Sequence, residues 1–387
     1  MKQKPNKILI VCGFFPLPMK FGGAIDVLKR IELINTLPNY EIDIICTIKS
    51  VPPQSEIDLL SKLVKNIFLV KRNNYLTSLF RSEPLQVCSR NKIKMLKLDK
   101  TYDLTILESE FVGPILENKT LKSKKVALRI HNNEEIYFKG LAKSSNSIFK
   151  KAYYFLDAIK LKIYSPKIFN KVDRLWFISS AEYQSNVSNF KNSIHLPTPV
   201  NLKFKVNTNN SKTVIYVCSL FMPNNIDGLV WYLNEVHKKL LSIEGYQLIV
   251  VGNLGDKKVS DFDFLIKKNK RVSLHTNVDD LDIFYQKSKI FINPMRMGSG
   301  VKLKSINAIE NGLLLVSTTV GIEGIGLVPS EMFFLADDAD NFYQKMFEAL
   351  HLSIDLKKTI TENAQKFLIQ KHDSSILINE LENVFNQ

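Results

Sequence analysis

The sequence lacks the long apolar runs of a membrane-spanning protein. Unbroken apolar stretches such as "LLLV" and "IFI" fall far short of the roughly 20 residues that cross a bilayer. The opening "MKQKPNKILIVCGFFPLP" joins a basic tip to a short apolar run. Because no small-residue cleavage site follows, we interpret that run as a strand and a Pro-rich turn. A mature cytosolic chain without a transmembrane helix is expected.

Metal and disulfide patterns are also missing. Four cysteines, Cys12, Cys46, Cys88 and Cys218, are widely separated and form no C-x-x-C pair, which argues against a disulfide framework and a zinc knuckle. The six histidines show no H-E-x-x-H spacing. Buried thiols, no metal and no cofactor are therefore predicted.

The common nucleotide and nucleic-acid signatures are absent as well. The chain contains neither G-x-G-x-x-G nor G-x-x-x-x-G-K-[ST], so the dinucleotide and P-loop interpretations have little support. No helix-turn-helix, RNP or zinc-finger pattern accompanies the basic charge. Nucleic acid is not an expected partner.

What the sequence does have is an uneven distribution of positive charge. The net charge is +15, and residues 1–200 hold 32 Lys and Arg against 17 Asp and Glu, whereas residues 201–387 hold 21 of each. A lysine-rich coding bias would raise both halves alike. The asymmetry indicates that the first half faces something anionic, such as a lipid surface or a phosphate-bearing acceptor.

Short β-rich runs alternate with helical patterns in both halves of the chain. The runs are rich in Ile, Val and Leu, as in "KILIVCG" and "YQLIVVGN", which is typical of parallel strands buried on both faces. The sequence therefore predicts an α/β fold of two doubly wound, Rossmann-like domains facing each other across a cleft. We assign residues 1–200 to an N-terminal domain, 201–212 to a linker, 213–370 to a C-terminal domain, and 371–387 to a helix that packs back on the first domain.

One stretch of the second half carries the strongest chemical signal. In "NPMRMGSGVKLKSINAIENG" a strand end leads to a glycine turn and then to a helix expected over 301–311. Gly298 and Gly300 would let an anion approach the backbone closely, where helix N–H groups favour negative charge. Lys302 and Lys304 oppose the helix dipole unless an anion lies between them. The alternative is an ordinary glycine turn with two solvated lysines.

An ordered series of stretches resembles a known family over about 150 residues. The C-terminal half, from "SLFMPNNIDGLVWYLNEV" through "LHTNVDDLDIFYQKSKIFINPMRMGSGVKLKSINAIENGLLLVSTTVGIEG" to "FFLADDADNFYQKM", is similar to the nucleotide-sugar domain of family-four, or group 1, retaining glycosyltransferases of GT-B architecture. The first half matches more loosely, through "FFPLPMKFGGA" and "RIHNNEEIYF". The resemblance implies a metal-independent retaining glycosyltransferase of hexosyltransferase type. It also implies that residues 1–200 form an acceptor-binding domain and residues 213–370 a nucleotide-sugar-binding domain.

That resemblance also assigns roles to residues. Backbone atoms of the loop at Asn277 and Val278 would hold the base, and His131 would contact the donor sugar or the diphosphate. The acceptor-side group and the donor-side turn are larger sets: Gly22, Gly23, Asn132 and Glu134 on the acceptor side, and Gly298, Ser299, Gly300, Val301, Lys302 and Lys304 on the donor side. A satisfied structural histidine and plain turn glycines are the alternative interpretations.

The chain departs from the family at one position that matters, Asn307, since many relatives with the G-x-G-x-K turn also lack a glutamate at the position of Ser299. The family commonly has two glutamates, eight residues apart, at the positions of Ser299 and Asn307, and neither residue here is acidic. Asn307 can still bond a ribose hydroxyl, but without the strength of a charged acceptor. Glu310 lies near the same face of the helix and is a possible substitute.

Leaving-group charge must be stabilised when the sugar–phosphate bond breaks. Metal-dependent transferases use a D-x-D site for this, and the candidates Asp261–Asp263 and Asp338–Asp340 are expected away from the glycine turn. The two lysines and the helix N-terminus would act instead. The resemblance implies retention by attack on the leaving-group face, with the departing phosphate oxygen taking the acceptor's proton.

A basic aromatic segment lies in the first half. Residues 139–171 hold eight lysines and one acidic residue, interleaved with aromatic side chains, a composition that suits an anionic membrane surface. The alternative places the aromatics in the core and the lysines in solvent. Because the family's acceptors are often lipid-linked, we expect a cytoplasmic protein that is peripheral on the inner face of the cell membrane, active in surface polysaccharide or glycoconjugate assembly.

Two other functions remain open at this point. A non-hydrolysing nucleotide-sugar epimerase shares the two-domain architecture, but it needs acid and base side chains near the sugar. A catalytically weak scaffold on the membrane is the other, and Asn307 is its best support. Release of nucleoside diphosphate only in the presence of acceptor would separate the glycosyltransferase from both.

Overall fold

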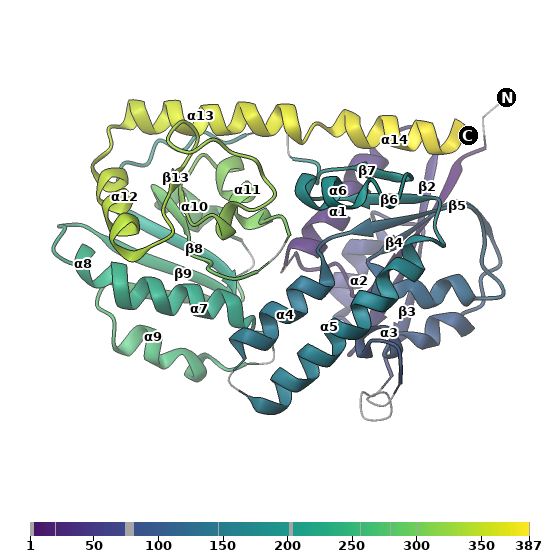
Figure 1. Cartoon of the computed structure of the whole chain (residues 1–387). Coiled ribbons are helices and arrows are strands. Elements are labelled where there is room, and N and C mark those ends of the chain that lie inside the picture. The colour runs from purple at the N-terminus through teal and green to yellow at the C-terminus, as the bar shows by residue number, and fades with distance from the viewer. Residues whose placement is uncertain are drawn as a thin grey trace. The chain divides into compact units, whose positions relative to one another are not determined.

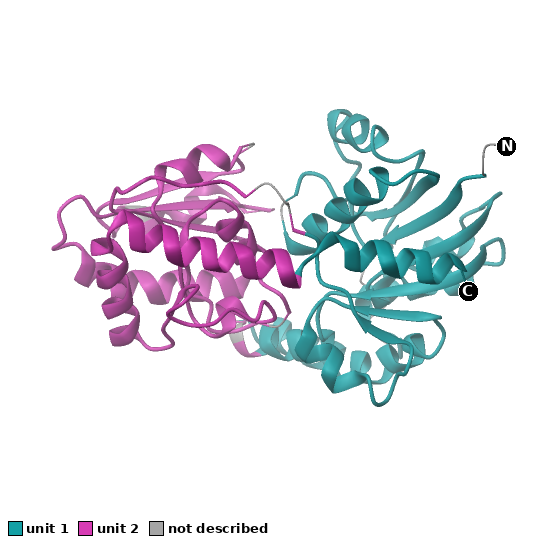
Figure 2. Cartoon of the chain, turned by 90° about the horizontal axis from the view of Figure 1, so that it is seen from above, with its two compact units in different colours: residues 1–142, 147–199, 372–387 teal, residues 143–146, 200–371 magenta. Residues whose placement is uncertain are grey.

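The computed structural model describes residues 4–19, 21–73, 81–145, 147–200, 204–255, 257–278, 280–298 and 300–386. The chain forms two compact units (Figure 2). The first unit comprises residues 1–142, 147–199 and 372–387, and the second comprises residues 143–146 and 200–371. The C-terminal segment is therefore part of the first unit, although it follows the second along the chain.

The first unit is built on a seven-stranded parallel sheet with helices on its faces (Figure 1). The strand order is β3-β2-β1-β4-β5-β6-β7. The strands are β1 (Asn6–Cys12), β2 (Tyr40–Ile48), β3 (Asn66–Lys71), β4 (Thr101–Glu108), β5 (Lys122–Ile130), β6 (Arg174–Phe177) and β7 (Ser193–His195). The helices are α1 (Gly22–Asn35), α2 (Gln54–Ser61), α3 (Leu85–Cys88), η2 (Asn91–Met95), η3 (Glu110–Glu117), α4 (Glu134–Ser144), α5 (Ile148–Phe169), α6 (Ser180–Asn186) and α14 (Ser374–Asn386).

Alternate residues of the strands fill two separate cores, one on each face of this sheet. Ile8 and Ile10 of β1 pack with residues of α1 and α14, whereas Leu9 and Val11 pack with residues of η3 and the end of α5. A strand buried on both faces has no polar side to alternate with, which explains the continuous apolar runs in the sequence.

The second unit is built on a six-stranded parallel sheet in the order β10-β9-β8-β11-β12-β13. The strands are β8 (Thr213–Ser219), β9 (Gln247–Asn253), β10 (Val272–Thr276), β11 (Ile290–Asn293), β12 (Leu314–Ser317) and β13 (Phe334–Leu335). The helices are α7 (Pro223–Trp231), η4 (Tyr232–His237), α8 (Lys238–Leu240), η5 (Val259–Phe262), α9 (Asp263–Lys267), α10 (Asp282–Lys287), α11 (Leu303–Glu310), η6 (Val320–Ile322), α12 (Ala339–His351) and α13 (Ile354–Lys371).

Both sheets have the same Rossmann-like topology. In each, the first three strands run outward in one direction and the following strands continue in the other, so the order reverses between β1 and β4 and between β8 and β11. The prediction of two doubly wound α/β domains is confirmed. Ligands of such sheets bind outside the carboxyl ends of the strands at the reversal point, which is where the site residues must be sought.

Several local predictions differ from the structure. The short strands β7 and β13 were not predicted. The stretch "PNNIDGLVWYLNEV" predicts a helix with Asn225 as its N-cap, but α7 begins at Pro223 and its N-cap is Met222, three residues earlier. Pro223 is the first residue of the helix, a position where proline's missing N–H costs nothing. All four cysteines are buried and free, as predicted. None of the helices in the described part of the chain is long and apolar enough to span a membrane.

Candidate functional site

The glycine turn of the second unit starts at the reversal point of its sheet. β11 ends at Asn293, whose side-chain amide donates to Ser305 Oγ at 2.9 Å and to the Gly321 carbonyl at 2.7 Å. Ser305 Oγ in turn donates to the same carbonyl at 2.8 Å. Asn293 and Ser305 are fully buried. These bonds fix the two ends of the turn, the strand before it and helix α11 after it, to the segment that follows β12.

The backbone of this turn takes conformations that favour glycine. Gly298 has φ +143° and Gly300 has φ +78°, both in the region that side chains with a Cβ rarely adopt. Ser299, between them, lies outside the described residues. We expected α11 to begin at Val301, but it begins at Leu303 with Lys302 as its N-cap. The turn therefore extends two residues further than predicted.

Helix α7 packs closely against the start of the turn. A Cβ on Gly228 would lie 2.5 Å from the Pro294 carbonyl oxygen, and one on Gly298 would lie 3.4 Å from Asn224 Nδ2. Arg296 also forms a bidentate ion pair with Asp227 of α7, at 2.9 and 3.0 Å from its Nη2. The loop after β8 and the loop after β11 are thus held together at the carboxyl edge of the sheet.

Lys302 is almost fully buried at the mouth of α11. Its ammonium donates to the Gly300 carbonyl and lies 3.1 Å from Glu323 Oε2. Glu323 is itself partly exposed. A ligand phosphate carrying more than one negative charge would compete with this carboxylate for the ammonium.

Lys304 lies one residue inside the helix and has a different environment. Its ammonium donates to Asn225 Oδ1 at 2.7 Å and to the Tyr216 hydroxyl at 3.4 Å, and it lies 5.0 Å from the centre of the Tyr216 ring. Burial lowers the pKa of Lys304 to about 7, and the charge of Lys302 contributes in the same direction. Among the described residues its contacts are all neutral, so the ammonium has no carboxylate to balance it.

The sequence did not identify Tyr216 and Asn225 as site residues. Tyr216 is a buried tyrosine in β8. Asn225, which we had placed at the N-cap of α7, instead donates its amide to the Ser219 carbonyl at 3.0 Å, and this orients its oxygen toward Lys304. The sequence feature that could have identified Tyr216 was a tyrosine within the apolar first strand of the second unit.

The predicted base-binding residues lie on a neighbouring loop of the same edge. Asn277 follows β10, has φ +51°, donates its backbone N–H to the Gly252 carbonyl at 3.0 Å and accepts from the Leu254 N–H at 3.2 Å. Val278 follows it directly and is partly exposed. The loops after β9 and β10 are therefore joined.

Asn307 and Glu310 lie further along α11. Asn307 is partly exposed, whereas Glu310 is nearly buried at the last position of the helix. At 1.5 Å per residue, Glu310 is about 9 Å along the helix from Lys304. The structure does not bring Glu310 to the two lysines.

In the first unit, His131 lies directly after β5, and its Nε2 is 3.0 Å from Glu108 Oε2 at the end of β4. Glu108 is fully buried and also pairs with Arg30 of α1, whose Nη2 is 2.6 Å from Oε1. His131 is thus oriented by a carboxylate at the reversal point of its own sheet.

A buried charge network supports this carboxylate. Asp26 of α1 accepts from Arg30 at 3.1 Å, from Arg129 at 2.7 and 2.9 Å, and from the Thr198 hydroxyl at 2.6 Å. Asp26, Glu108 and His131 are the group within the described residues whose spacing would suit a metal, but both carboxylates are already paired with guanidinium groups. A single charged residue inside each apolar strand, "LTILE" and "ALRI", was the signal that could have found this network.

The remaining acceptor-side predictions lie near the same edge. Gly22 and Gly23 are the first residues of α1, and a Cβ on Gly23 would meet the Phe14 ring at 3.3 Å. Glu134 begins α4, is buried, and accepts from Asn132 Nδ2 at 3.5 Å. Burial and the neighbouring charge of Glu110 raise the pKa of Glu134. Glu110, which sequence analysis missed, is also buried.

The two D-x-D candidates have structural partners. Asp261 accepts from the Lys258 N–H at 3.0 Å and Asp263 pairs with Lys267. Asp338 caps α12 and Asp340 pairs with Lys239. Neither pair belongs to the glycine turn.

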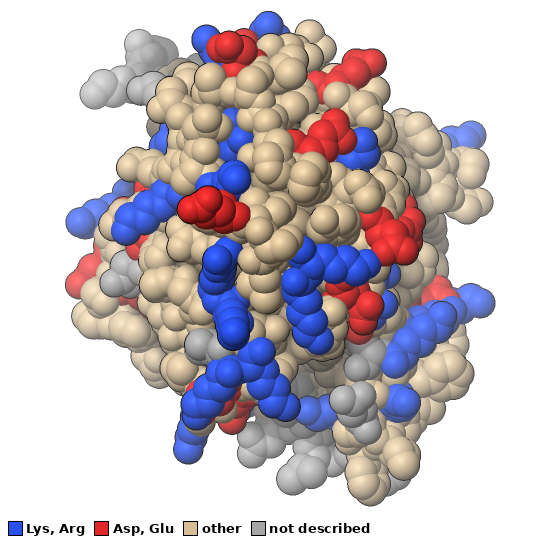
Figure 3. Space-filling model, turned by 90° about the vertical axis from the view of Figure 1, so that its left-hand side faces the viewer, with Lys and Arg blue, Asp and Glu red and all other residues tan. Residues whose placement is uncertain are grey.

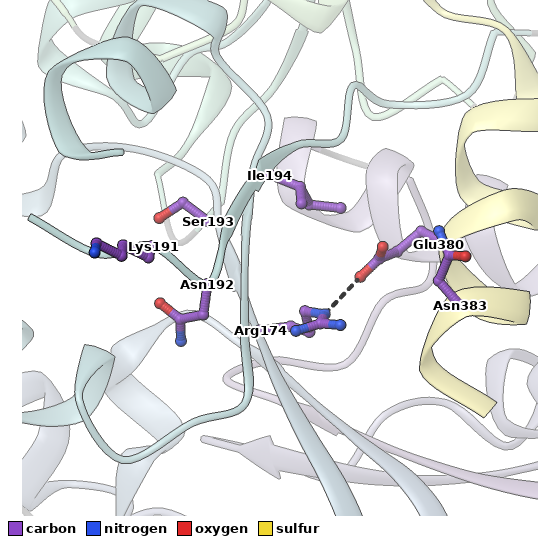
Figure 4. A pocket seen from close by; sticks show the side chains of 7 residues that line it. All are labelled: Arg174, Lys191, Asn192, Ser193, Ile194, Glu380 and Asn383. Atoms are coloured by element: carbon purple, nitrogen blue, oxygen red, sulfur yellow. Dashed lines mark ion pairs between the residues drawn. The ribbon is translucent and has the colours of Figure 1, made fainter. Parts of the chain in front are cut away.

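A hollow of about 350 Å³ lies in the first unit beside α14 (Figure 4). It is lined by Arg174, Lys191, Asn192, Ser193, Ile194, Glu380 and Asn383. Arg174 and Ser193 are the first residues of β6 and β7, so the hollow is at the amino edge of the sheet. Because parallel sheets bind ligands at the carboxyl edge, we do not assign the hollow to the functional site.

Comparison with known proteins concerns the family and the fold of the chain. Residues 211–351 match the family model described as "Glycosyl transferases group 1". A protein from Klebsiella pneumoniae, described as an uncharacterized 44.6 kDa protein in the cps region, is 34% identical over 95% of this chain and 97% of its own length. The capsular polysaccharide biosynthesis glycosyltransferase CapM of Staphylococcus aureus is 28% identical over 38% of this chain and 40% of its own.

A solved structure shares the fold over the whole chain. A mutant form of TarM of S. aureus, crystallised with fondaparinux, α-GlcNAc-glycerol and UDP, superposes with a TM-score of 0.71, covering 99% of this chain and 100% of TarM at 11% identity. At that identity the likeness concerns the fold.

Proposed function

This chain belongs to the group 1 glycosyltransferases and has the paired Rossmann-like units of the GT-B fold, and from that membership we propose a specific reaction. The protein moves a sugar from a nucleotide-diphosphate sugar to a hydroxyl of a glycan or lipid-linked acceptor, with retention at the anomeric carbon and without a metal ion. It is of hexosyltransferase type, and its relatives suggest a role in surface polysaccharide assembly.

The observation that carries the proposal is the unbalanced ammonium of Lys304 at the mouth of α11. A buried charge without a counter-charge is destabilising, so a site that retains one is suited to a ligand that supplies the missing charge. Lys302, the N–H groups at the start of α11 and the glycine turn all favour an anion at the same place. A diphosphate meets these requirements, and UDP is the nucleotide in the TarM crystal.

The reaction then follows from where charge develops. As the bond between the anomeric carbon and the diphosphate oxygen breaks, negative charge grows on that oxygen, and the two ammonium groups stabilise it. The acceptor hydroxyl attacks from the same face as the leaving group, and the departing phosphate oxygen takes its proton. Retention follows from this geometry of attack.

The other roles are proposals from the family resemblance. The loop at Asn277 and Val278 holds the base through backbone atoms, Asn307 bonds the ribose, and His131 contacts the transferred sugar or the diphosphate. Gly22, Gly23, Asn132 and Glu134 serve the acceptor. We place the reaction on the inner face of the cell membrane, where lipid-linked acceptors meet the basic first half of the chain.

A panel of nucleotide sugars tests the proposal. Ligand at 100 times its dissociation constant should stabilise the protein by about 2.7 kcal/mol, which is readily measured as a rise in melting temperature. Nucleoside diphosphate should be released only when acceptor is present, and the rate should be unchanged in EDTA. Lack of a melting shift with every donor would favour the scaffold alternative, and donor conversion without acceptor would favour the epimerase.

A further inference from the structure

Helix α5 of the first unit has two contrasting faces. Its inner face is buried and includes Ala158, Leu161 and Ile168, of which the first two pack with Phe138 and with the partly buried Tyr153 and Tyr154. The aromatic residues that made the segment look membrane-active in the sequence are therefore partly in the core. Figure 1 shows α5 as a long helix on the outside of this unit.

The outer face of α5 is apolar. Six large apolar side chains on this helix are between 43% and 88% exposed: Ile148, Phe149, Phe155, Leu156, Ile159 and Ile163. Ile148, Ala152, Phe155, Ile159 and Ile163 are spaced by four, three, four and four residues, so they form one stripe along the helix. Isolated exposed apolar residues are ordinary, but a continuous row of them marks an interaction surface. We call this row of five residues, from Ile148 to Ile163, the α5 stripe.

Lysines border the α5 stripe on both sides. At about 100° per residue, Lys151 and Lys162 lie on one flank and Lys160 and Lys167 on the other. The one acidic residue of the helix, Asp157, is buried and accepts from the Leu85 N–H at 3.1 Å. The outward-facing charge of α5 is therefore all positive.

We propose that the α5 stripe is the membrane-docking surface of the protein: the helix lies in the plane of an anionic bilayer, with its apolar row inserted and its lysines at the headgroups. An apolar face bordered by lysines, on a helix too polar to span the bilayer, is the arrangement of interfacial helices. Lysine stems can also lie along the apolar boundary while their ammonium groups stay in water. The inference deepens the proposed membrane location by naming the surface, and it does not depend on sugar transfer.

The positive charge around the α5 stripe favours an anionic lipid surface over a second copy of this chain. An interface with a second copy of this chain would bring two lysine-bordered stripes together, and like charges at a rim oppose association. The face drawn in Figure 3 looks different, because acidic side chains lie among its basic side chains. The described residues of α5 offer no such balance.

Vesicle flotation of the full-length protein tests the proposal. Wild-type protein should float with vesicles of equal parts phosphatidylcholine and phosphatidylglycerol and remain below with phosphatidylcholine alone. The triple variant Phe155→Gln, Ile159→Gln and Ile163→Gln should bind the anionic vesicles at least roughly tenfold more weakly, because glutamine keeps helix propensity but removes the apolar row.

A matched control tests whether the effect is specific to the α5 stripe or follows from the loss of any exposed apolar side chains. Leu59→Gln, Ile283→Gln and Leu356→Gln together remove three side chains that are 51% to 56% exposed on other helices, and this variant should float like wild type. For charge, Lys151→Gln with Lys162→Gln should weaken binding by about fivefold per lysine, whereas Lys267→Gln with Lys268→Gln on the second unit should not.

The stripe variant should keep the wild-type melting temperature, so that a loss of flotation is a loss of docking and not of the fold. Transfer of sugar to a soluble acceptor is assayed separately and tests the enzyme, not the docking. Phe155→Trp supplies a direct readout: its fluorescence should shift to the blue with anionic vesicles and be quenched by brominated lipid. Equal flotation of the stripe and control variants would refute the proposal. So would a wild-type dimer that the stripe variant dissociates without any change in flotation.

Discussion

Lys304 and Asp26 are both charged residues in the interior, but their surroundings differ. Asp26 is matched by Arg30, Arg129 and the Thr198 hydroxyl, so its charge is balanced within the first unit. Lys304 contacts an amide oxygen, a hydroxyl and an aromatic ring. The first arrangement holds a structure together, and the second leaves a charge available to a ligand.

Proton uptake on donor binding follows from the pKa of Lys304. Burial lowers that pKa from 10.5 to about 7, and a bound diphosphate must raise it again. Above pH 7 the free site is increasingly neutral, so binding should take up a proton and the affinity for nucleoside diphosphate should fall as pH rises. Calorimetric titration at pH 8 in buffers of different ionisation enthalpy measures the uptake. Lys304→Met should abolish it and weaken binding by about ten- to a hundredfold.

Two glutamate substitutions in the first unit contrast a buried and a surface ion pair. Glu108→Gln leaves Arg30 partly unbalanced in the interior and should lower the free energy of unfolding by about 3–5 kcal/mol. Glu117→Gln removes the exposed partner of Lys94 and should cost less than about 1 kcal/mol. Urea unfolding at pH 7 measures both, and equal values would contradict the distinction.

At acidic pH, the free energy of unfolding of Glu108→Gln should approach that of the wild type. Burial opposes ionisation of Glu108, but Arg30 and His131 hold its pKa below 4.5. A carboxyl group whose pKa is lower when folded stabilises the protein above its unfolded pKa and loses that contribution as pH falls. The stability gap should therefore shrink below about pH 4.5.

At the scale of elements, the glycine turn shows how far pattern alone reaches. The sequence predicted the strand, the turn and a helix ended by glycine, because apolar periodicity and glycine positions are local signals. It did not predict that Lys302 stays outside α11 or that Asn225 faces Lys304. Those facts depend on how α7 and α11 pack, and Asn225 and Lys304 are 79 residues apart.

Because α7 packs closely on the glycine turn, a substitution in α7 should weaken ligand binding although it does not touch Lys302 or Lys304. Gly228→Ala would place a methyl group 2.5 Å from the Pro294 carbonyl oxygen, so the free energy of unfolding should fall by about 1–3 kcal/mol and nucleoside diphosphate should bind more weakly. Gly140→Ala is the control, since a Cβ there has nothing within 4 Å in helix α4 and should stabilise by up to about 1 kcal/mol. A destabilised Gly228→Ala with wild-type affinity would contradict the link.

At the scale of the whole molecule, fold class was predictable and the site was only partly so. Buried strands appear as apolar runs whatever they pack against, but β13 has only two residues, Phe334 and Leu335, and a strand that short shows no period that the sequence could reveal. Glu108 and Arg129 are neighbours in the β4–β5 register, and only the register reveals that two charged residues of separate strands meet. The donor and acceptor roles remain predictions, because they concern molecules that the chain alone does not contain.

Helix α14 extends the core of the first unit from the far end of the chain. Leu381 is fully buried in the cluster that contains Ile8 and Val27, and Trp176 donates to Glu380 at 2.8 Å. Leu381→Ala should lower the free energy of unfolding by about 2–5 kcal/mol. Leu356→Ala on α13, where the side chain is 56% exposed, should change it by less than about 0.5 kcal/mol. Similar losses in the two variants, measured by urea unfolding, would count against this role of α14.

The return of residues 372–387 to the first unit has an evolutionary consequence. The second unit is inserted within the first, so exchanging it between relatives requires two recombination points, one near residue 200 and one near residue 371. A single junction that joined residues 1–199 to a foreign partner would leave Trp176 beside a helix of another protein, or beside none. Chimaeras designed to change sugar specificity should therefore keep their own final helix.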